Sequence, residues 1–202
     1  MHIMNAVDVT PEATLDSVII EGASSGSLAW PQVTFLEVLV HNVSAETIDL
    51  SDAHLGDCTL RSVTAATLET TRSGIASATF DSCRFGVMKA SEAVLRDVEF
   101  VGCKIDYLNL RSAKLRDVSF RDCVISEFDG IDADLTRVSF PGTRINDFSA
   151  HGARLKDVDL RTAQLRGITD ATGLAGVTMT HSQVLDLADA FATHLGIIVA
   201  AE

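Results

Sequence analysis

The residues best suited to metal or redox chemistry are the four cysteines, Cys58, Cys83, Cys103 and Cys123. Zinc sites use closely spaced Cys-x-x-Cys pairs whose thiolates converge on the ion from several directions. The last three cysteines are instead far apart and evenly spaced along the chain, a spacing that stacks thiols in parallel. Free cysteine commonly serves as a small buried apolar residue. The sequence therefore predicts buried thiols, no metal and no cofactor.

The histidines and hydroxyl groups show no catalytic arrangement. The six histidines are His2, His41, His54, His151, His181 and His194. No Ser/His/Asp set, carboxylate pair in a cleft or phosphate-binding glycine loop is recognisable among the motifs. Residues 22–26 resemble such a loop, but they lack its Gly-Lys-Ser/Thr ending. We therefore expect a protein that is not an enzyme.

Carboxylates are the most abundant remaining functional groups. The chain has 28 acidic and 16 basic side chains, for a formal net charge of −12. Residues 1–60 contain nine acids and no Lys or Arg, whereas residues 61–180 are balanced. Phosphate binding needs clustered basic residues. The composition thus argues against nucleic acid as a direct ligand and concentrates negative charge in the N-terminal part.

A pentapeptide period determines where these groups lie. From Leu15 to Leu165 every fifth residue is apolar except Ser25, Thr70 and Gly130, and a second apolar column runs two positions earlier. No charged residue occupies either column. An α-helix would repeat its apolar stripe about every 3.6 positions and a strand every second position. A spacing of two and then three predicts a short extended piece with two inward side chains, followed by a corner.

Side-chain size recurs every fourth pentad, which predicts four sides per coil. Ala and Leu form one side (Ala93 and Leu95), and Val and Phe form the next (Val98 and Phe100). Large residues are paired with small ones because a protein interior is filled at high density. We expect a leader over 1–12, eight coils over 13–172, and a helical cap with an apolar tail over 173–202. Eight coils give a rod of roughly 38 Å at about 4.8 Å per coil.

The C-terminal segment changes period. Residues 180–196 have the pattern of one amphipathic helix, with Thr180 or Ser182 as N-cap and Gly196 as the left-handed stop. This segment either caps the last coil or also forms a two-fold dimer. The candidate cap and dimer residues are Val184, Leu185, Ala188, Phe191, Leu195, Ile197 and Ile198.

Segments such as Ala-Asp-Leu-Thr-Arg at 133–137 and Ala-Arg-Leu-Lys-Asp at 153–157 resemble the pentapeptide-repeat superfamily. The resemblance covers most of the chain and implies an all-β solenoid, a right-handed quadrilateral β-helix. Asp or Asn is infrequent here at the second, outward position of the motif. Members that protect DNA gyrase resemble this chain in both the rod and the C-terminal helical segment, and they are dimers that imitate DNA. The resemblance therefore implies a homodimer that binds gyrase or another DNA-binding protein.

Two functions remain open at this stage. The first is a DNA mimic that modulates gyrase or protects it from inhibitors, and the second is a structural scaffold with another protein partner. In the first, acidic side chains form the partner-facing surface. The candidates are Glu37, Glu46, Asp49, Asp52 and Asp57 near the N-terminus, with Asp106, Glu127, Asp129, Asp132 and Asp147 on the third and fourth sides.

Location is predicted from what the sequence lacks. No apolar run approaches the roughly 20 residues that span a bilayer, and the N-terminus lacks the basic and apolar regions of a secretory signal. We expect a cytoplasmic protein without a membrane partner.

Neighbouring opposite charges such as Arg116 and Asp117 recur at coil spacing, and we expect them to form a solvated ladder.

Overall fold

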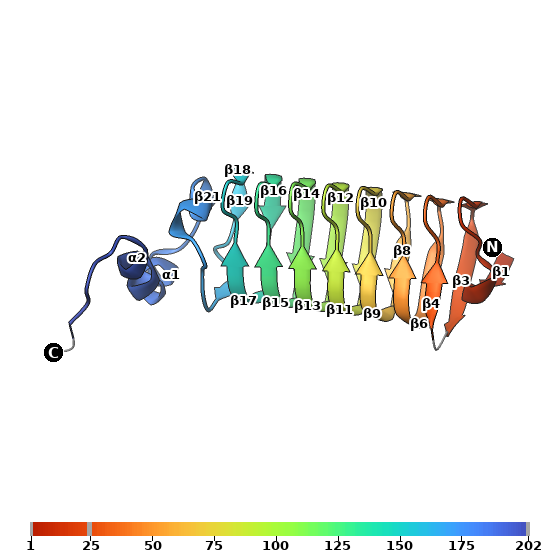
Figure 1. Cartoon of the computed structure of the whole chain (residues 1–202), viewed down its shortest axis with the longest axis horizontal. Coiled ribbons are helices and arrows are strands. Elements are labelled where there is room, and N and C mark those ends of the chain that lie inside the picture. Colours follow the sequence, from red (N-terminus) through yellow and green to blue (C-terminus); the bar gives the residue numbers. More distant parts are fainter. Residues whose placement is uncertain (1, 24–25, 201–202) are drawn as a thin grey trace.

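The computed structural model describes residues 2–23 and 26–200 and shows a straight rod of stacked coils (Figure 1). Strand β1 lies at one end of the rod, and helices α1 and α2 lie at the other. Ser25, which interrupts the apolar column, and the outermost residues of the leader and tail lie outside the described residues. About nine turns of parallel strands make up the rod.

Most strands are short because each one covers one or two sides of a coil, and only β6 continues along three. In chain order the elements are β1 (His2–Asn5), the 3₁₀ helix η1 (Ala6–Asp8), β2 (Thr14–Asp16), β3 (Val18–Ala23), β4 (Ser27–Ala29), β5 (Thr34–Leu36), β6 (Leu39–Asp49), β7 (His54–Gly56), β8 (Thr59–Arg61), β9 (Thr64–Glu69), β10 (Gly74–Asp81), β11 (Arg84–Lys89), β12 (Val94–Val101), β13 (Lys104–Asn109), β14 (Lys114–Arg121), β15 (Val124–Asp129), β16 (Asp134–Ser139), β17 (Arg144–Ser149), β18 (Arg154–Lys156), β19 (Val158–Asp159), β20 (Gln164–Leu165), the 3₁₀ helix η2 (Ala171–Leu174), β21 (Val177–Thr178), α1 (His181–Asp186) and α2 (Ala188–His194).

Strands on successive coils pair in a register of four pentads through most of the rod. Leu95 of β12 pairs with Leu115 of β14, and Ile105 of β13 pairs with Ile125 of β15. We define side 1 by positions 93–97, side 2 by 98–102, side 3 by 103–107 and side 4 by 108–112, together with the positions that pair with them in the other coils.

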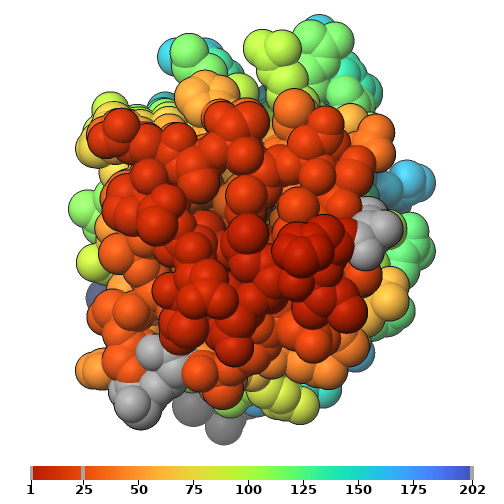
Figure 2. Space-filling view, turned by 90° about the vertical axis from the view of Figure 1, so that its right-hand side faces the viewer, coloured from red at the N-terminus to blue at the C-terminus, as the bar shows by residue number. Residues whose placement is uncertain are grey.

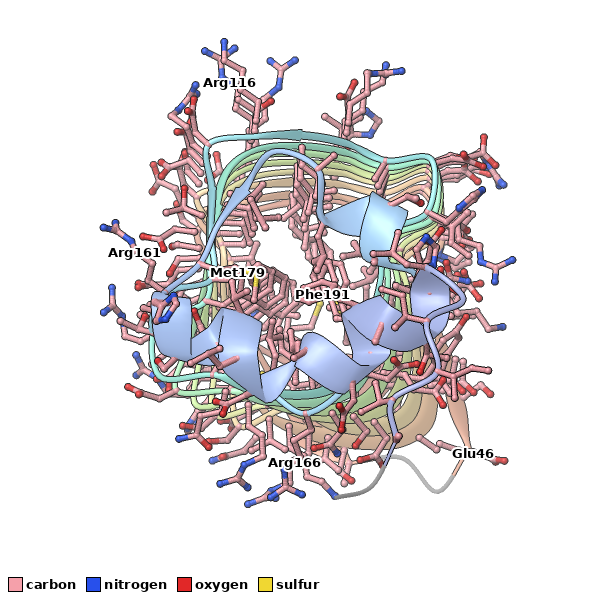
Figure 3. The ribbon with its side chains drawn as sticks, turned by 90° about the vertical axis from the view of Figure 1, so that its left-hand side faces the viewer. Glu46, Arg116, Arg161, Arg166, Met179 and Phe191 are labelled. Atoms are coloured by element: carbon pink, nitrogen blue, oxygen red, sulfur yellow. The ribbon has the colours of Figure 1, made fainter. Side chains whose placement is uncertain are left out.

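Seen from the C-terminal end, successive sides follow one another counterclockwise as the chain approaches the viewer. Arg116 marks side 1 at the top of Figure 3, Arg161 marks side 2 at the left, and Arg166 marks side 3 at the bottom. This sense of winding is right-handed. The prediction of a right-handed quadrilateral β-helix is confirmed.

The two apolar columns form the core. Every residue in them from Leu28 to Ala150 is buried. On side 2 the rings of Phe80, Phe100, Phe120 and Phe140 stack, with neighbouring centroids 4.5, 4.7 and 5.2 Å apart. Offset stacking adds about 0.5–1.5 kcal/mol per aromatic pair beyond the burial of area. Each coil is therefore stabilised chiefly by the coils above and below it.

Polar residues within the columns have hydrogen-bond partners. The Thr143 hydroxyl donates to the carbonyl of Phe120 at 2.7 Å and accepts from the amide of Cys123 at 3.0 Å. The Ser73 hydroxyl donates to the carbonyl of Thr70 at 2.7 Å. A buried polar group without a partner would cost about 1–3 kcal/mol. These interruptions are therefore compatible with the core.

The corners require a left-handed backbone. Three of the four corners place a residue at positive φ two positions after the second inward side chain, as in Asp97 (φ 55°), Ser82 (φ 57°) and Glu92 (φ 59°). Gly102 (φ 60°) occupies such a corner without steric cost. A non-glycine residue there costs about 1–2 kcal/mol. Many of the non-glycine corner residues are Asp, as in Asp97, and Asp tolerates this conformation better than most residues, so the turn residues and the apolar columns both favour a turn at these positions.

The coil around residues 22–26 departs from the expected register. Strand β3 pairs with β6, and between Glu21 and Gly22 the register shifts so that Gly22 lies opposite Val43. Ala23, which we predicted to point inward, is exposed as a result. One bulge thus interrupts the otherwise regular repeat.

Parallel pairing extends beyond residues 13–172 at both ends. Strand β1 pairs with β3, and the Trp30 indole donates to the carbonyl of Ala6 at 3.2 Å. At the other end, β21 pairs with β19 out of the regular register, because Val177 instead of Thr178 lies opposite Val158. The leader therefore adds a partial coil before the first one, and the segment after residue 172 adds a strand beyond the last one.

The C-terminal cap consists of two short helices, so the prediction of one helix was wrong. Thr180 and Gln183 form a capping box at the start of α1, and the chain changes direction at Leu187 (φ −100°, ψ 7°). The Gln183 side-chain amide donates to the carbonyls of Leu160 and Ala163 at 2.6 and 2.8 Å. Leu187 is 3% exposed. Gln183 thus anchors α1 to the last coil, and after the break Phe191 of α2 packs against the core.

The phenylalanine stack provides a test of this core. Phe100→Ala should lower the free energy of unfolding by about 3–5 kcal/mol, because it opens a cavity between two rings. Denaturant titration of the full chain measures this change. Val101→Ala alters the adjacent outward side chain and should change stability by less than about 0.5 kcal/mol. Equal effects of the two variants would contradict the packing described here.

Candidate partner-binding surfaces

The five N-terminal candidate acids encircle the rod instead of sharing one face. Glu37 and Asp57 occupy the corner after side 1, whereas Glu46 projects from side 3 (Figure 3). Asp49 lies on side 4, and Asp52 lies at the corner between sides 4 and 1. Their common property is therefore position along the axis, within the first coils.

Four of these five acids are not paired with a base. Asp52 alone forms an ion pair, because both its oxygens accept from the guanidinium of Arg72 at 2.8 and 2.7 Å. This hydrogen bond lowers the pKa of Asp52. Among the described residues, no ion pair involves the other four acids. Negative charge in the first coils is thus largely uncompensated.

The shaft, in contrast, contains equal numbers of acids and bases, and about half of its acids form ion pairs, most of them between neighbouring coils. Arg137 donates two hydrogen bonds to Asp117 at 2.5 and 2.7 Å, and Arg154 donates two to Asp134 at 3.0 and 2.6 Å. The expected neighbouring pair of Arg116 and Asp117 is longer, at 3.6 Å. The ladder therefore runs chiefly from coil to coil, since the register of the strands places outward side chains above one another.

The second group of candidate acids is partly brought together where side 3 meets side 4, in what we call the hollow on side 4. Glu127, Asp129 and Asp147 line an open hollow of about 340 Å³. Asp106 and Asp132 lie outside it, and Asp106 is 3.2 Å from the Lys104 ammonium. The other residues lining the hollow are Tyr107, Arg111, Phe128, Ile131, Ser149 and Thr169.

Asp129 is the structural centre of this hollow. It is 6% exposed and accepts hydrogen bonds from the Tyr107 hydroxyl and the Arg111 Nε, both at 2.7 Å. The pKa of the Tyr107 phenol is raised, chiefly by burial and in the second place by the hydrogen bond to Asp129. Sequence reasoning did not identify Tyr107 or Arg111, because they are 22 and 18 positions from Asp129 and therefore fall outside the regular ladder of 20.

Glu127 and Asp147 supply the negative charge that faces outward. They lie in register on β15 and β17, and Asp147 accepts a hydrogen bond from the Thr169 hydroxyl at 2.8 Å. With Asp129 already bound to Arg111, these two carboxylates make the hollow suited to a lysine or arginine side chain. Within residues 2–23 and 26–200, no group of three His, Cys, Asp or Glu side chains could hold a metal.

The candidate cap and dimer residues fall into two groups. Phe191 packs against the core cluster. Val184, Leu185, Ala188, Leu195, Ile197 and Ile198 are exposed. Leu195 and Ile198 are 71% and 94% exposed, on a tail that extends away from the rod. Phe191 therefore contributes to the cap, and the six exposed residues remain candidates for the dimer contact.

An acidic group holds the cap to the last coil. Asp170 lies 2.5 Å from Nδ1 of His151 and 3.4 Å from Nδ1 of His194 on α2. The pKa of Asp170 is lowered to about 2, chiefly by the hydrogen bond from Thr172 and in the second place by the one from His151. Asp170 thus connects the coil, η2 and α2.

The cysteines occupy the inward column, where all four are buried and none is in a disulfide. The thiols of Cys83, Cys103 and Cys123 donate to carbonyls of the preceding coil, those of Leu60, Phe80 and Phe100, at 3.3, 3.2 and 3.5 Å.

No helix in the described part of the chain is long and apolar enough to cross a membrane.

Tyr107 is the single tyrosine, which makes the hollow directly measurable. Ionisation of the phenol changes its absorbance. In denaturant this change should have a midpoint at about pH 10, and in the folded chain the midpoint should lie at a higher pH. Asp129→Asn should move this titration towards the unfolded value. The matched variant Glu127→Gln should move it much less. An unchanged titration in Asp129→Asn would contradict the hydrogen bond.

Comparison with known proteins gives one family and a set of solved structures. Residues 73–150 match the family model described as a pentapeptide repeat region. No curated protein matches the chain. Full-length QnrB1, a plasmid-mediated fluoroquinolone resistance protein, is 17% identical over 97% of this chain and 95% of its own, with a TM-score of 0.44. HetL from the cyanobacterium Nostoc sp. strain PCC 7120, involved in heterocyst differentiation regulation, is 17% identical over 78% of this chain and 85% of its own, with a TM-score of 0.36. Residues 73–150 therefore belong to the pentapeptide repeat family, and the same four-sided coil continues through the strands on both sides of them.

Proposed function

We propose that this chain is a non-enzymatic rod that binds the basic, DNA-contacting surface of a protein partner. DNA gyrase, a type II topoisomerase, is the first candidate partner. Binding would modulate the enzyme or protect it from inhibitors. The single observation that carries this proposal is the uncompensated negative charge of the N-terminal coils beside an ion-paired shaft.

A DNA-binding surface recognises closely spaced negative charges through clustered Lys and Arg. Glu37, Glu46, Asp49 and Asp57 are held on a rigid scaffold with no base to neutralise them among the described residues. Fixed charges of one sign attract a basic partner over roughly a Debye length, about 8 Å at physiological salt. The N-terminal coils therefore supply a phosphate-like field without a nucleic acid.

The hollow on side 4 offers a more specific contact. Glu127 and Asp147 border it, while Tyr107 and Ile131 provide an uncharged wall. A basic side chain inserted there would be paired on one side and covered on the other, which strengthens a charge-assisted hydrogen bond. This hollow would fix the orientation of a partner attracted by the N-terminal field.

Gyrase is named because of the sequence resemblance rather than the charge alone. The Ala-x-Leu repeats and the helical C-terminal segment resemble members that protect gyrase as dimers. Leu195, Ile197 and Ile198 are exposed on the tail and would form the two-fold contact. Two rods joined end to end would present their acidic ends in opposite directions.

A scaffold that binds a different protein is the second candidate. The coil-to-coil pairs of Arg137 with Asp117 and Arg154 with Asp134 favour it, because they remove net charge from most of the rod. A partner of this kind would recognise the shape of the rod and local contacts instead of a continuous anionic field. Its binding would depend weakly on salt.

A supercoiling assay distinguishes these candidates. The chain should inhibit gyrase or restore its activity in the presence of a quinolone, and this effect should weaken as salt rises. The quadruple variant Glu37→Gln, Glu46→Gln, Asp49→Asn and Asp57→Asn should require at least about tenfold more protein for the same effect.

A matched control neutralises four shaft acids and changes net charge equally. It combines Glu92→Gln, Asp97→Asn, Asp122→Asn and Asp157→Asn, and it should act like the unmodified chain. No effect on gyrase at micromolar concentration would reject the gyrase proposal. A salt-insensitive interaction with another protein would support the scaffold.

The proposed end-to-end dimer is tested by light scattering. The unmodified chain should have twice the 21.6 kDa mass of the monomer. At about 0.5 M salt, where a weak electrostatic contact is screened, Leu195→Asp with Ile198→Asp should yield the monomer, because both exposed side chains would carry charge into the C-terminal contact. Ser44→Asp on side 3 is the control and should leave the mass unchanged. A monomeric unmodified chain would contradict the dimer.

A further inference from the structure

Side 1 has an apolar hollow in its N-terminal half. The hollow measures about 320 Å³ and spans the outward positions of β5, β7, β10 and β12. Gly56, Gly74 and Ala76 leave its floor without long side chains, and Leu36 borders it with 44% of its surface exposed. Most outward positions elsewhere in the repeat are polar or charged, so this strip of side 1 is chemically distinct.

Acidic side chains border the same half of side 1. Asp16 lies on the first coil, and Glu37 and Asp57 occupy the corner beside the hollow. Among the described residues, none of the three takes part in an ion pair. Ser17 donates a hydrogen bond to Glu37 at 3.3 Å but brings no charge. This half therefore combines an apolar floor with an anionic border at its first coils, and Arg96 is the one lysine or arginine among the residues that line the hollow.

The C-terminal half of side 1 has the opposite character. Its outward positions hold the bases Lys114, Arg116, Arg154 and Lys156 together with the acid Asp134, and its corner holds Arg137 with the acids Asp117 and Asp157, so that bases outnumber acids by five to three. Arg116 extends from the top of the rod in Figure 3. In Figure 2, side chains from the middle of the sequence stand above the N-terminal coils along the upper edge. One half of side 1 thus projects and is basic, while the other is hollow and acidic.

We propose that side 1 is a self-association surface on which two copies pack face to face with their axes antiparallel. A two-fold axis across side 1 places the basic half of each copy on the acidic half of the other. Such an interface is isologous, so every favourable contact occurs twice. A second copy is the occupant because it carries both complementary halves at the same coil spacing.

The coil register predicts which residues meet. When side 1 of both copies overlaps fully from coil 1 to coil 8, each residue faces the same pentad position of the other copy, and at the fourth position the numbers of the facing residues add up to 172. Arg116 then faces Gly56 of the second copy, and Lys156 faces Asp16. The aliphatic stem of Arg116 would cover the apolar floor while its guanidinium reaches Asp57. Lys156 and Asp16 would form an ion pair at each end.

The size of the surface sets the expected strength. One side of eight coils covers about 38 by 13 Å, so the pair would bury on the order of 1,000 Å² in total. This area is near the lower limit for a specific interface, which predicts weak, micromolar and salt-sensitive association. The contact would also cover Glu37 and Asp57 and would therefore compete with a basic partner.

Sedimentation velocity of the full chain tests the proposal across protein concentration and at about 0.05 and 0.5 M salt. Each measurement is repeated with Leu195→Asp and Ile198→Asp, so that the C-terminal contact is removed and side-1 association is seen alone. We expect a monomer–dimer equilibrium in this background that weakens as salt rises. A monomer at all concentrations up to the millimolar range would overturn the proposal.

Charge exchange identifies the surface. Arg116→Glu and Lys156→Asp should each weaken association at least about tenfold. Asp16→Lys combined with Lys156→Asp should restore it, because the pair re-forms with reversed sign. Arg84→Glu on side 3 makes the same charge change as Arg116→Glu and should leave association intact. Equal weakening by Arg84→Glu, or failure of the exchanged pair to restore association, would overturn the antiparallel register.

Discussion

The stacking of inward side chains between neighbouring coils is the constraint on which the whole structure depends. A single coil cannot bury its apolar residues, because both its faces along the axis are open, so each coil depends on its neighbours. The ring stack through Phe100 and the hydrogen bonds of Thr143 show how closely successive coils must match. A charged side chain in either column would face a filled interior with no water to solvate it.

The same constraint creates the surface. Once the interior fixes the register between coils, each outward residue lies above its equivalents in the adjacent coils. Ladders such as Arg137 on Asp117 follow directly, and each exposed pair contributes little stability by itself. Their main consequence is electrostatic, because they leave the shaft neutral and the first coils anionic. The corners contribute in another way, since they hold charged residues such as Asp57 and Asp97 at positive φ and direct them outward.

The hollows on sides 1 and 4 result from exceptions to the regular pattern. Glycine and alanine at outward positions leave the floor of side 1 bare, whereas on side 4 Tyr107 and Arg111 both turn towards the buried Asp129. The two sites have different chemistry, since one combines an apolar floor with separate acidic and basic halves and the other is a local acidic depression. A rod with a uniform interior can therefore carry several distinct binding surfaces, each formed by a different outward column.

The sequence by itself determined the four-sided coil, the inward columns, the buried cysteines and the charge gradient, because each depends on a period that can be counted along the chain. Only the tertiary structure decided which acids remain unpaired, how Asp129 gathers Tyr107 and Arg111, and where the chain breaks between α1 and α2. Those features depend on contacts across corners and coil ends, where the spacing is no longer a multiple of five. The bulge at Gly22 exposes Ala23, and it too could be seen only in the structure. The shift in pairing is by one position, and the apolar columns of the sequence continue past it almost without interruption.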